Sequence, residues 1–235
     1  MNKSEQEQIV AMFDRIAPTY DVANRILSLG LDRGWRKRAA RALPNRESLA
    51  VLDIATGTAD LLLYFCKICP NISRAVGVDM AEEMLLRARE KVSNSPFSKL
   101  VSLERADGAS LPFKAASFDV VSIAFGIRNI VLKKQALSEM FRVLKSDGVA
   151  LILEFSLPTN SLVRYFYLIY FRHILPLLGS LISRDNKAYR YLNCSVESFP
   201  MPQIFKDELL EVGFQSVKVE PLSLGIATLY SARKA

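Results

Sequence analysis

The spacing of apolar positions predicts three helical stretches at the start of the chain. Between residues 9 and 16, apolar side chains recur at i, i+3, i+4 and i+7, which is the stripe of an amphipathic helix, and Pro18 ends that helix. A second stretch includes residues 26–29, and a third includes the basic run at residues 36–41. That run has two interpretations, a solvated helix face or a patch that binds a membrane surface or a nucleic acid.

From residue 50 the pattern alternates between short apolar runs and amphipathic stripes. The apolar runs predict strands at residues 50–54, 75–78, 100–105, 118–124 and 148–155. The stripes predict helices between them, at residues 61–68, 84–92 and 137–144. Because parallel neighbours need a crossover and helices cover both faces of the sheet, this alternation predicts a Rossmann-like α/β sandwich.

The last part of the chain leaves this alternation and then returns to it. A helical stripe at residues 205–212 is followed by two short strands, at 217–219 and 226–230. Strands so close in sequence must be antiparallel. A mostly parallel sheet that ends in an antiparallel hairpin is typical of class I methyltransferases that use S-adenosylmethionine, which this architecture resembles.

Composition supports one globular domain. The 235 residues are 50% hydrophobic and 23% charged, which excludes a disordered or low-complexity chain. We divide the domain into a helical lead (1–48), a cofactor-binding core (49–156), an insertion (157–200) and a C-terminal helix and hairpin (201–235). No uncharged stretch reaches the length of a transmembrane helix.

The remaining composition narrows the location and the chemistry. The polar N-terminus is unlike a secretory signal and three cysteines cannot form a disulfide framework, so we expect a cytoplasmic protein. A single histidine excludes a His-rich metal site, and no metal is expected. The net charge of +7 favours an acidic partner, either nucleic acid or anionic lipid, or simply serves solubility.

The turn after the first strand, Asp53 to Asp60, is the first candidate binding site. It lacks the glycine pattern that holds the pyrophosphate of a dinucleotide. We expect Asp53 and Asp60 to face the ligand, where they would repel a pyrophosphate and attract the ammonium and sulfonium groups of S-adenosylmethionine. Gly57 would let the backbone approach that ligand closely.

Two further carboxylates follow the next strands. Asp79 ends the second strand, where an acidic residue accepts hydrogen bonds from ribose hydroxyls, although a helix cap is the alternative. Asp107 follows the third strand and could accept from the adenine amino group. Acids at three successive strand ends predict a nucleoside site at one edge of the sheet.

Seven segments spread over nearly the whole chain are distinctive. They are residues 12–21 (MFDRIAPTYD), 31–36 (LDRGWR), 111–113 (LPF), 124–129 (AFGIRN), 142–145 (RVLK), 153–156 (LEFS) and 188–192 (AYRYL). In these segments the chain resembles the ubiquinone/menaquinone biosynthesis C-methyltransferase family, whose members methylate a ring carbon of polyprenylated quinols.

The resemblance implies cofactor contacts at four positions, Thr58, Asp79, Asp107 and Gly108. The chain departs from the family at Ala59, where a glycine is usual, and at Ala124, where some members have serine. These departures bear on cofactor affinity and not on the type of reaction.

The implied activity is methyl transfer from S-adenosylmethionine to a polyprenyl quinol, with demethylmenaquinol as the first choice of substrate. The methoxy benzoquinol of the ubiquinone pathway is the alternative quinol. An RNA methyltransferase and a cofactor-binding subunit without activity remain open as competing functions. The aromatic residues of the insertion favour a lipid over a nucleic acid.

Four residues are candidates for the chemistry. We expect Arg128 to lower the pKa of the quinol and stabilise the phenolate, with Asn129 fixing its orientation. An internal salt bridge is the alternative role of Arg128. Tyr20 and Asp21 could close over the cofactor as a lid and relay a proton, or simply cap a helix. His173 lies among bulky apolar residues, and we expect a buried or snorkelling structural histidine there.

The insertion mixes aromatic, aliphatic and basic side chains, which suits an interfacial helix or the wall of a prenyl tunnel. Core packing or a homodimer interface is the alternative. Pro176 and Gly179 exclude one long straight helix, and Leu178 is a candidate tunnel residue. The expected partners are therefore a polyprenyl quinol and the inner face of an anionic membrane. The Cys66 and Cys69 pair is expected to have no redox role.

Overall fold

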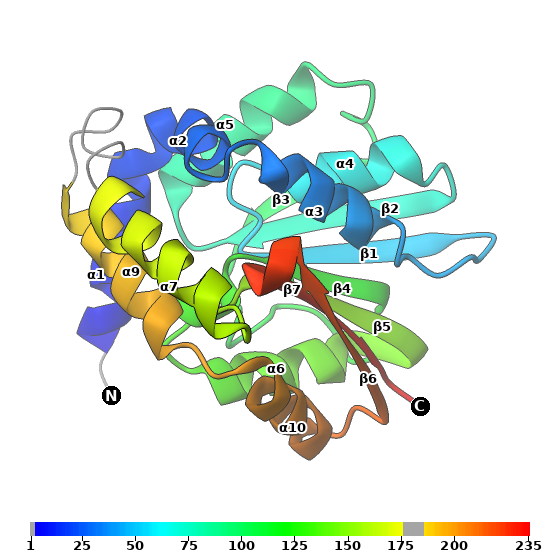
Figure 1. The fold of residues 1–235 in the computed structure, drawn as a ribbon. Coiled ribbons are helices and arrows are strands. Elements are labelled where there is room, and N and C mark those ends of the chain that lie inside the picture. Colours follow the sequence, from blue (N-terminus) through cyan, green and yellow to red (C-terminus); the bar gives the residue numbers. More distant parts are fainter. Residues whose placement is uncertain (1–2, 176–185) are drawn as a thin grey trace.

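The computed structural model describes residues 3–175 and 186–235. Within these residues seven strands form one sheet in the order β3-β2-β1-β4-β5-β7-β6, with helices on both faces (Figure 1). The strands are β1 (Leu49–Ile54), β2 (Ile72–Asp79), β3 (Val101–Arg105), β4 (Phe118–Ala124), β5 (Leu144–Phe155), β6 (Ser216–Leu222) and β7 (Ala227–Arg233).

Long helices and short helical turns connect the strands. The α-helices are α1 (Lys3–Ile16), α2 (Tyr20–Leu27), α3 (Leu31–Ala40), α4 (Asp60–Ile68), α5 (Glu82–Ser93), α6 (Lys133–Val143), α7 (Ser161–Ile169), α9 (Asn186–Ser198) and α10 (Pro202–Val212). The short turns are η1 (Ala17–Thr19), η2 (Ile127–Asn129), the π-helical η3 (Tyr170–Ile174) and η4 (Ser223–Gly225). Each helix predicted from the apolar spacing is present.

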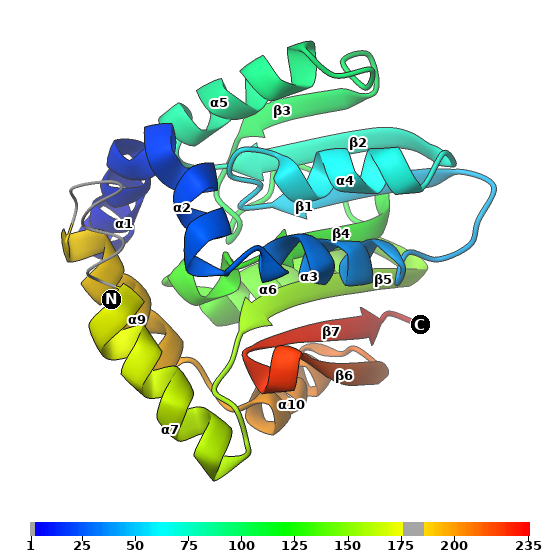
Figure 2. The same cartoon turned by 45° about the horizontal axis from the view of Figure 1, so that its top comes forward.

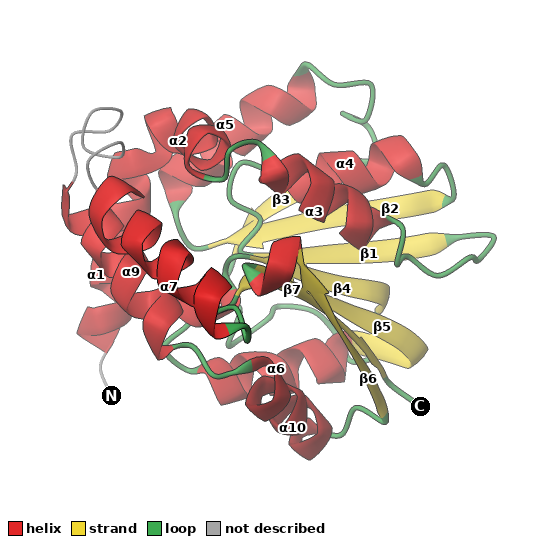
Figure 3. Cartoon of the chain, viewed as in Figure 1, coloured by secondary structure: helices red, strands yellow, loops and turns green. Residues whose placement is uncertain are grey.

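The sheet is parallel except at its C-terminal end. Strands β1 to β5 pair in parallel, whereas β7 lies between β5 and β6 and is antiparallel to both (Figure 3). The predicted antiparallel hairpin is therefore confirmed. Its second strand, and not its first, joins the parallel part of the sheet.

Two helical layers cover the sheet (Figure 2). Helices α3, α4 and α5 pack on one face through side chains such as Trp35 and Phe65. Helices α6 and α10 pack on the other face through Met140 and Phe205. These layers bury strands such as β4, whose Phe118 is completely enclosed, so the sheet and its strand ends form the rigid part of the molecule.

A third group of helices covers the carboxyl edge of the parallel strands. Helices α7 and α9 lie side by side there, next to α1 and α2 (Figures 1 and 2). Tyr167, Phe171 and Leu175 of the insertion pack against Val196 of α9 in a small cluster of their own. This cover encloses the strand ends, where ligands bind in open α/β sheets.

Three predictions need correction in detail. The apolar stripe at residues 137–144 predicts a helix that includes residue 144. In the structure α6 ends at Val143, and Leu144 is the first residue of β5. Leu144 still faces the core, which is why it continues the helical pattern. Leu29 lies after the end of α2, in a turn with a φ of 52°. His173 is exposed, so of the two alternatives, buried or snorkelling, the buried one is wrong.

The positions named within 176–185, Pro176, Leu178 and Gly179, lie outside the described residues. In residues 3–175 and 186–235, every helix falls short of the length or the apolar character that a membrane span requires.

Candidate active site

Two adjoining cavities lie at the carboxyl edge of the parallel strands. The smaller has a volume of about 70 Å³ and the larger a volume of about 480 Å³. Phe13, Tyr20 and Phe125 line both of them. Ligands in the two cavities would therefore meet at a wall of three aromatic side chains.

The smaller cavity is built from the ends of β1, β2, β3 and β4. Asp79, at the end of β2, accepts hydrogen bonds from the backbone N–H of Gly57 (2.8 Å) and of Ala81 (2.9 Å). Burial raises the pKa of Asp79, and the two backbone donors only partly offset this effect. The carboxylate is thus held rigidly, and its remaining lone pairs are available to hydroxyl donors of a ligand.

The turn after β3 supplies Asp107 and Gly108 to the same cavity. Asp107 Oδ1 accepts from the backbone N–H of Ala109 over 2.9 Å. A side chain at position 108 would place its Cβ only 2.8 Å from Cγ2 of Ile54 and 2.9 Å from Cδ1 of Ile130. The glycine is therefore required for the backbone to pass between these two apolar side chains.

The hydrogen-bond acceptors and apolar side chains of the smaller cavity fit a nucleoside. Two carboxylates lie among apolar side chains of the cavity wall, which suits a ligand that has hydroxyl and amino donors on a flat apolar body. The apolar members of that wall include Ile9, Val10, Ile54, Met84 and Ile130.

Asp53 lies behind the turn and lines neither cavity, and its place among the cofactor-binding residues stays a prediction. It lies opposite Ser122 in the register of β1 and β4, and its carboxylate accepts from Ser122 Oγ (2.6 Å) and Thr56 Oγ1 (2.7 Å). Burial raises its pKa to about 6. Asp53 therefore stabilises the turn after β1 through its hydrogen bond with Thr56.

A network of charged and polar side chains occupies the outer side of the same turn. Lys91 of α5 lies 2.5 Å from Asp21 and 2.6 Å from Asp60, and it also donates to Thr58 Oγ1 over 2.9 Å. Thr58 Oγ1 in turn donates to Asp21 over 2.7 Å. The side chains of these four residues line neither cavity, which corrects the expectation for Asp60.

The same network changes the roles expected for Asp21 and Thr58. Asp21 ties α2 to α5 through Lys91 and lines neither cavity, so a part in a proton relay stays a prediction. The hydroxyl of Thr58 is committed to Asp21 and Lys91. Only Tyr20, of the two residues predicted to form a lid, lies at the cavities.

Tyr20 forms part of the shared wall. Its ring lies close to the cofactor turn, since a Cβ at Gly57 would be 3.8 Å from Cε1 of Tyr20. Burial raises the pKa of Tyr20, and a hydrogen bond with Asn24 opposes this in part. Near neutral pH, Tyr20 is therefore a neutral phenol that can donate a hydrogen bond.

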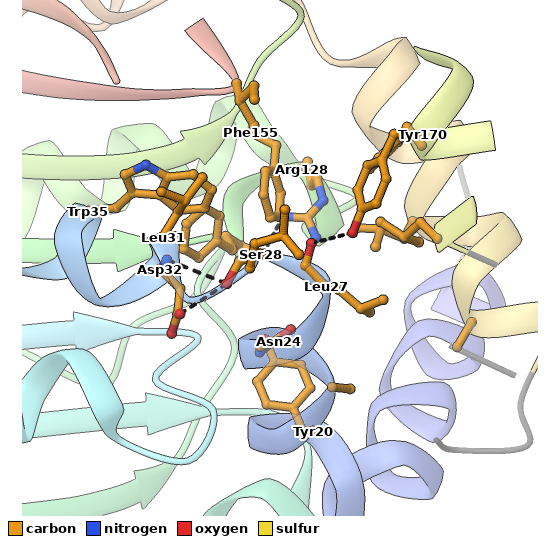
Figure 4. Close-up of a pocket in the computed structure, with 18 of the residues that line it drawn as sticks. Tyr20, Asn24, Leu27, Ser28, Leu31, Asp32, Trp35, Arg128, Phe155 and Tyr170 are labelled. Carbon is orange, nitrogen blue, oxygen red and sulfur yellow. Dashed lines mark hydrogen bonds between the residues drawn. The ribbon is translucent and has the colours of Figure 1, made fainter. Parts of the chain in front are cut away.

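The larger cavity has an aromatic side and a polar side. Figure 4 shows Tyr20, Asn24, Ser28 and Asp32 along α2 and α3, with Tyr170 on the opposite wall. The aromatic and aliphatic wall comes from α7, η3 and α9. Its members are Val163, Phe166, Tyr167, Tyr170, Phe171, Leu175, Tyr191 and Leu192.

Arg128 reaches the larger cavity from η2, after β4. Its Nη1 donates to Glu154 Oε1 (2.6 Å) and to the carbonyl of Phe125 (2.5 Å), and the guanidinium lies 5.2 Å from the ring centre of Phe155. Burial raises the pKa of Glu154, whereas Arg128 lowers it. The internal salt bridge considered for Arg128 is present, and the residue lines the cavity as well.

Asn129 connects the two cavities. It lines the smaller one, and its Oδ1 accepts from the hydroxyl of Tyr191, which lines the larger one, over 3.1 Å. Its Nδ2 donates to the carbonyl of Phe125 over 3.2 Å. Asn129 thus fixes Tyr191 and the loop of Phe125.

Sequence reasoning missed several residues of the larger cavity, although signals for some were present. Glu154 is a single charge inside the apolar run of β5, which indicates a buried partner. Asn24 follows Tyr20 by four residues, so these two share one face of α2, whereas Ser28 and Asp32 reach the cavity only through the turn between α2 and α3. Nothing in the local sequence places Tyr191 beside Asn129.

The sequence comparisons identify relatives over nearly the full length. Residues 1–234 match the ubiE/COQ5 methyltransferase family. The chain is 46% identical over 228 residues to the ubiquinone/menaquinone biosynthesis C-methyltransferase UbiE of Geotalea uraniireducens, with 97% of each chain covered. It is 40% identical over 231 residues to the demethylmenaquinone methyltransferase of Bacteroides fragilis, covering 98% of this chain and 94% of the relative.

Solved structures agree on the fold. A SAM-dependent methyltransferase from Thermotoga maritima superposes with a TM-score of 0.67 at 16% identity, covering 97% of this chain and 100% of that one. A second, from Aquifex aeolicus, gives 0.62 at 17% identity over 85% and 89% of the two chains. The predicted Rossmann-like methyltransferase fold is confirmed. From the family match and the two close relatives, the chain belongs to the ubiE/COQ5 methyltransferase family.

Proposed function

We propose that this methyltransferase transfers the methyl group of S-adenosylmethionine to a ring carbon of a polyprenylated quinol, with demethylmenaquinol as the substrate. The observation that carries the proposal is the wall shared by the two cavities. Tyr20 and Phe125 separate a small site that bears carboxylates from a large site that is mainly aromatic. A flat apolar ring in the large site would lie beside a nucleoside-bearing donor in the small one.

The residues of the smaller cavity suit the cofactor. Asp79 would accept from the ribose hydroxyls and Asp107 from the adenine amino group, while the backbone at Gly57 and Gly108 allows a close approach. When bound, S-adenosylmethionine supplies an electrophilic methyl group on a positively charged sulfur.

The residues of the larger cavity suit a quinol ring. Methylation of a ring carbon requires that the quinol first lose a hydroxyl proton and later lose the hydrogen on the methylated carbon. Hydrogen-bond donors near the ring oxygen favour the first loss because they stabilise the phenolate. Two buried donors beside the cavity, Nε of Arg128 and the hydroxyl of Tyr167, have no hydrogen-bond partner within residues 3–175 and 186–235. Neighbouring atoms cover both donors, so a ligand oxygen would reach them only after a local shift of the surrounding side chains.

Glu154 tempers the role expected for Arg128. The Arg128 guanidinium and the buried Glu154 carboxylate together carry almost no net charge. The pair therefore lowers the pKa of a quinol, about 10 for a free phenol, less than an unpaired guanidinium would. We therefore assign Arg128 to orientation of the ring oxygen, with a smaller electrostatic effect. Tyr20, held as a neutral phenol, is the second donor at the ring.

The choice of quinol rests on the relatives. The Bacteroides fragilis protein is named for demethylmenaquinone alone, whereas the Geotalea uraniireducens protein is named for both pathways. The methoxy benzoquinol therefore stays as the alternative substrate. The aromatic character of the larger cavity favours either quinol over RNA, which binds chiefly through exposed basic groups and base stacking.

The test is transfer of labelled methyl from S-adenosylmethionine to reduced short-tailed demethylmenaquinone and, separately, to the methoxy benzoquinol. We expect label in the naphthoquinol, and a large loss of turnover in Arg128→Ala. Arg89→Ala, which removes an exposed arginine of α5, is the matched control and should retain turnover. Failure of both quinols to gain label contradicts the proposal, and label in the benzoquinol alone reassigns the substrate.

A further inference from the structure

The mouth of the larger cavity is lined by apolar side chains that are also exposed on the outer surface. Leu29, in the turn between α2 and α3, is 75% exposed, and Phe166 of α7 is 62% exposed, yet both line the cavity. Leu31 is exposed there as well. Exposed apolar residues that surround an opening are unusual for a surface in contact only with water.

The exposed apolar surface extends beyond the mouth on both sides. On α7, Leu162 lies one turn before Phe166, and the ring of Tyr165 packs 5.5 Å from the ring of Phe166. On the other side, Leu224 of η4 is 77% exposed. We call this surface the mouth face. It consists of Leu29, Leu31, Leu162, Tyr165, Phe166 and Leu224.

Two contacts fix η4 between α3 and the start of α7. Trp35 Nε1 of α3 donates to Ser223 Oγ over 2.9 Å. On the opposite side, Ser156 Oγ donates to the carbonyl of Gly225 over 2.8 Å, and a Cβ at Gly225 would lie 3.4 Å from Pro158. The exposed Leu224 is the central residue of this turn and therefore lies between α3 and the segment that leads into α7.

The segments around the mouth carry mainly basic residues. The sequence from residue 155 to 175 contains no Asp or Glu, and the sequence from 22 to 46 contains only Asp32. Asp32 is buried and paired with Arg36, whereas Arg33 and Lys37 are exposed on α3. Basic residues around an apolar patch are the complement of anionic lipid headgroups.

The size of the cavity is the third argument, and it rests on the proposed function. A volume of about 480 Å³ suits a ring with a short substituent. A long polyprenyl tail would leave between Leu29 and Phe166, because the mouth lies there. The medium that accommodates such a tail is the interior of a bilayer.

We propose that the mouth face docks on the surface of an anionic lipid bilayer, so that the tail stays in the membrane while the ring enters the cavity. A second copy of the chain is a poorer occupant, because two mouth faces would bring like charges together. The contact is interfacial, with the apolar side chains entering the headgroup region and the basic residues attracted to phosphate.

The test is co-sedimentation with vesicles, using equal parts of phosphatidylglycerol and phosphatidylcholine against pure phosphatidylcholine. The double variant Leu162→Asp/Leu224→Asp removes two apolar contacts without touching a residue that lines the cavity. We expect the wild type to bind the anionic vesicles, and the double variant to bind at least about tenfold more weakly. Added salt should weaken wild-type binding.

Leu86→Asp is the matched control, because Leu86 is 48% exposed on α5, away from the mouth. It should bind vesicles like the wild type. Equal vesicle binding by the double variant, or an equal loss in Leu86→Asp, overturns the proposal. A dimer that the double variant loses, without vesicle binding by the wild type, also overturns it and assigns the face to self-association.

Turnover of a short-tailed quinol without vesicles separates this proposal from the proposed function. We expect the double variant to keep that turnover, and circular dichroism to show an intact fold. If the wild type binds vesicles but methylates no quinol, the docking surface stands and the substrate assignment fails. If the wild type methylates the short-tailed quinol but binds no vesicles, the docking proposal fails alone.

Discussion

Nη1 of Arg128 lies 2.6 Å from Oε1 of Glu154, and both side chains are almost completely buried at the edge of the larger cavity. A buried ion pair of this kind owes its stability to the presence of both partners, since each charge has lost its hydration. The pair therefore has a structural consequence that can be separated from its role at the ring.

Removing one partner should be much more costly than removing both. We expect Arg128→Met to lower the free energy of unfolding by about 3–5 kcal/mol, because Glu154 is left buried without its partner. Arg128→Met/Glu154→Leu should lose far less than the sum of the single variants. Urea unfolding of the four proteins measures the coupling, and strict additivity would contradict the pairing.

Asp53 should make part of the stability depend on pH. Its folded-state pKa of about 6 lies above the ordinary value of 3.8, so the folded state holds the proton more tightly than the unfolded state. The contribution of Asp53 is fully present below about pH 4 and is lost as the pH rises through about 6, by about 3 kcal/mol in total.

Asp53→Asn tests this contribution, because asparagine cannot ionise. Relative to the wild type, the variant should gain stability between pH 4 and pH 7, in unfolding titrations at each pH. Carboxyls with a lowered pKa, such as Asp119 and Glu139, act in the opposite direction but cancel in this comparison. A stability difference that does not change with pH would count against burial of the charge.

Loss of the charge on Asp79 and loss of the charge on Asp53 should affect cofactor binding differently. Asp79→Asn should weaken binding of S-adenosylhomocysteine by roughly tenfold to a hundredfold, because hydrogen bonds to a charged acceptor are lost. Asp53→Asn should change the affinity little, since Asp53 lines neither cavity. Calorimetric titration of both variants decides between them, and equal losses would restore Asp53 to the binding site.

Tyr20 and Asp21 are neighbours in sequence with different expected effects. Tyr20→Phe removes a donor from the shared wall and should lower kcat/KM for the quinol roughly tenfold. Asp21→Asn weakens a half-exposed contact with Lys91 and should change kcat/KM less than about threefold. Steady-state kinetics at saturating cofactor compare them, and a large loss in Asp21→Asn would revive a proton relay.

Much of the fold follows from local pattern. The apolar stripes of α1, α5 and α10 and the buried runs of β1 and β4 are read directly from residue spacing. The position of β7 between β5 and β6 is not, because strand order depends on contacts between distant segments. The end of α2 was also missed, because Leu29 adopts a positive φ that no sequence signal marks.

The part of the candidate site that lies at the ends of the parallel strands could be predicted from the sequence. Asp79 and Asp107 were placed at one edge of the sheet, and both line the smaller cavity. The side chain of Asp53 points to its cross-strand neighbour Ser122, a direction that depends on sheet register and that residue spacing alone does not give. The wall of the larger cavity joins α2 to α9, a relationship that one-dimensional spacing cannot supply.

The placement of β7 also bears on how the protein is made. Ile226 lines the larger cavity and Ala227 begins the strand that joins β5 to β6, yet β7 is the last of these seven strands to leave the ribosome. Until then, the edge of β5 that pairs with β7 has no neighbour, and the cavity wall lacks Ile226. A nascent chain stalled before β7 should therefore expose an unpaired strand edge, which is a recognised target for chaperones and a hazard for aggregation.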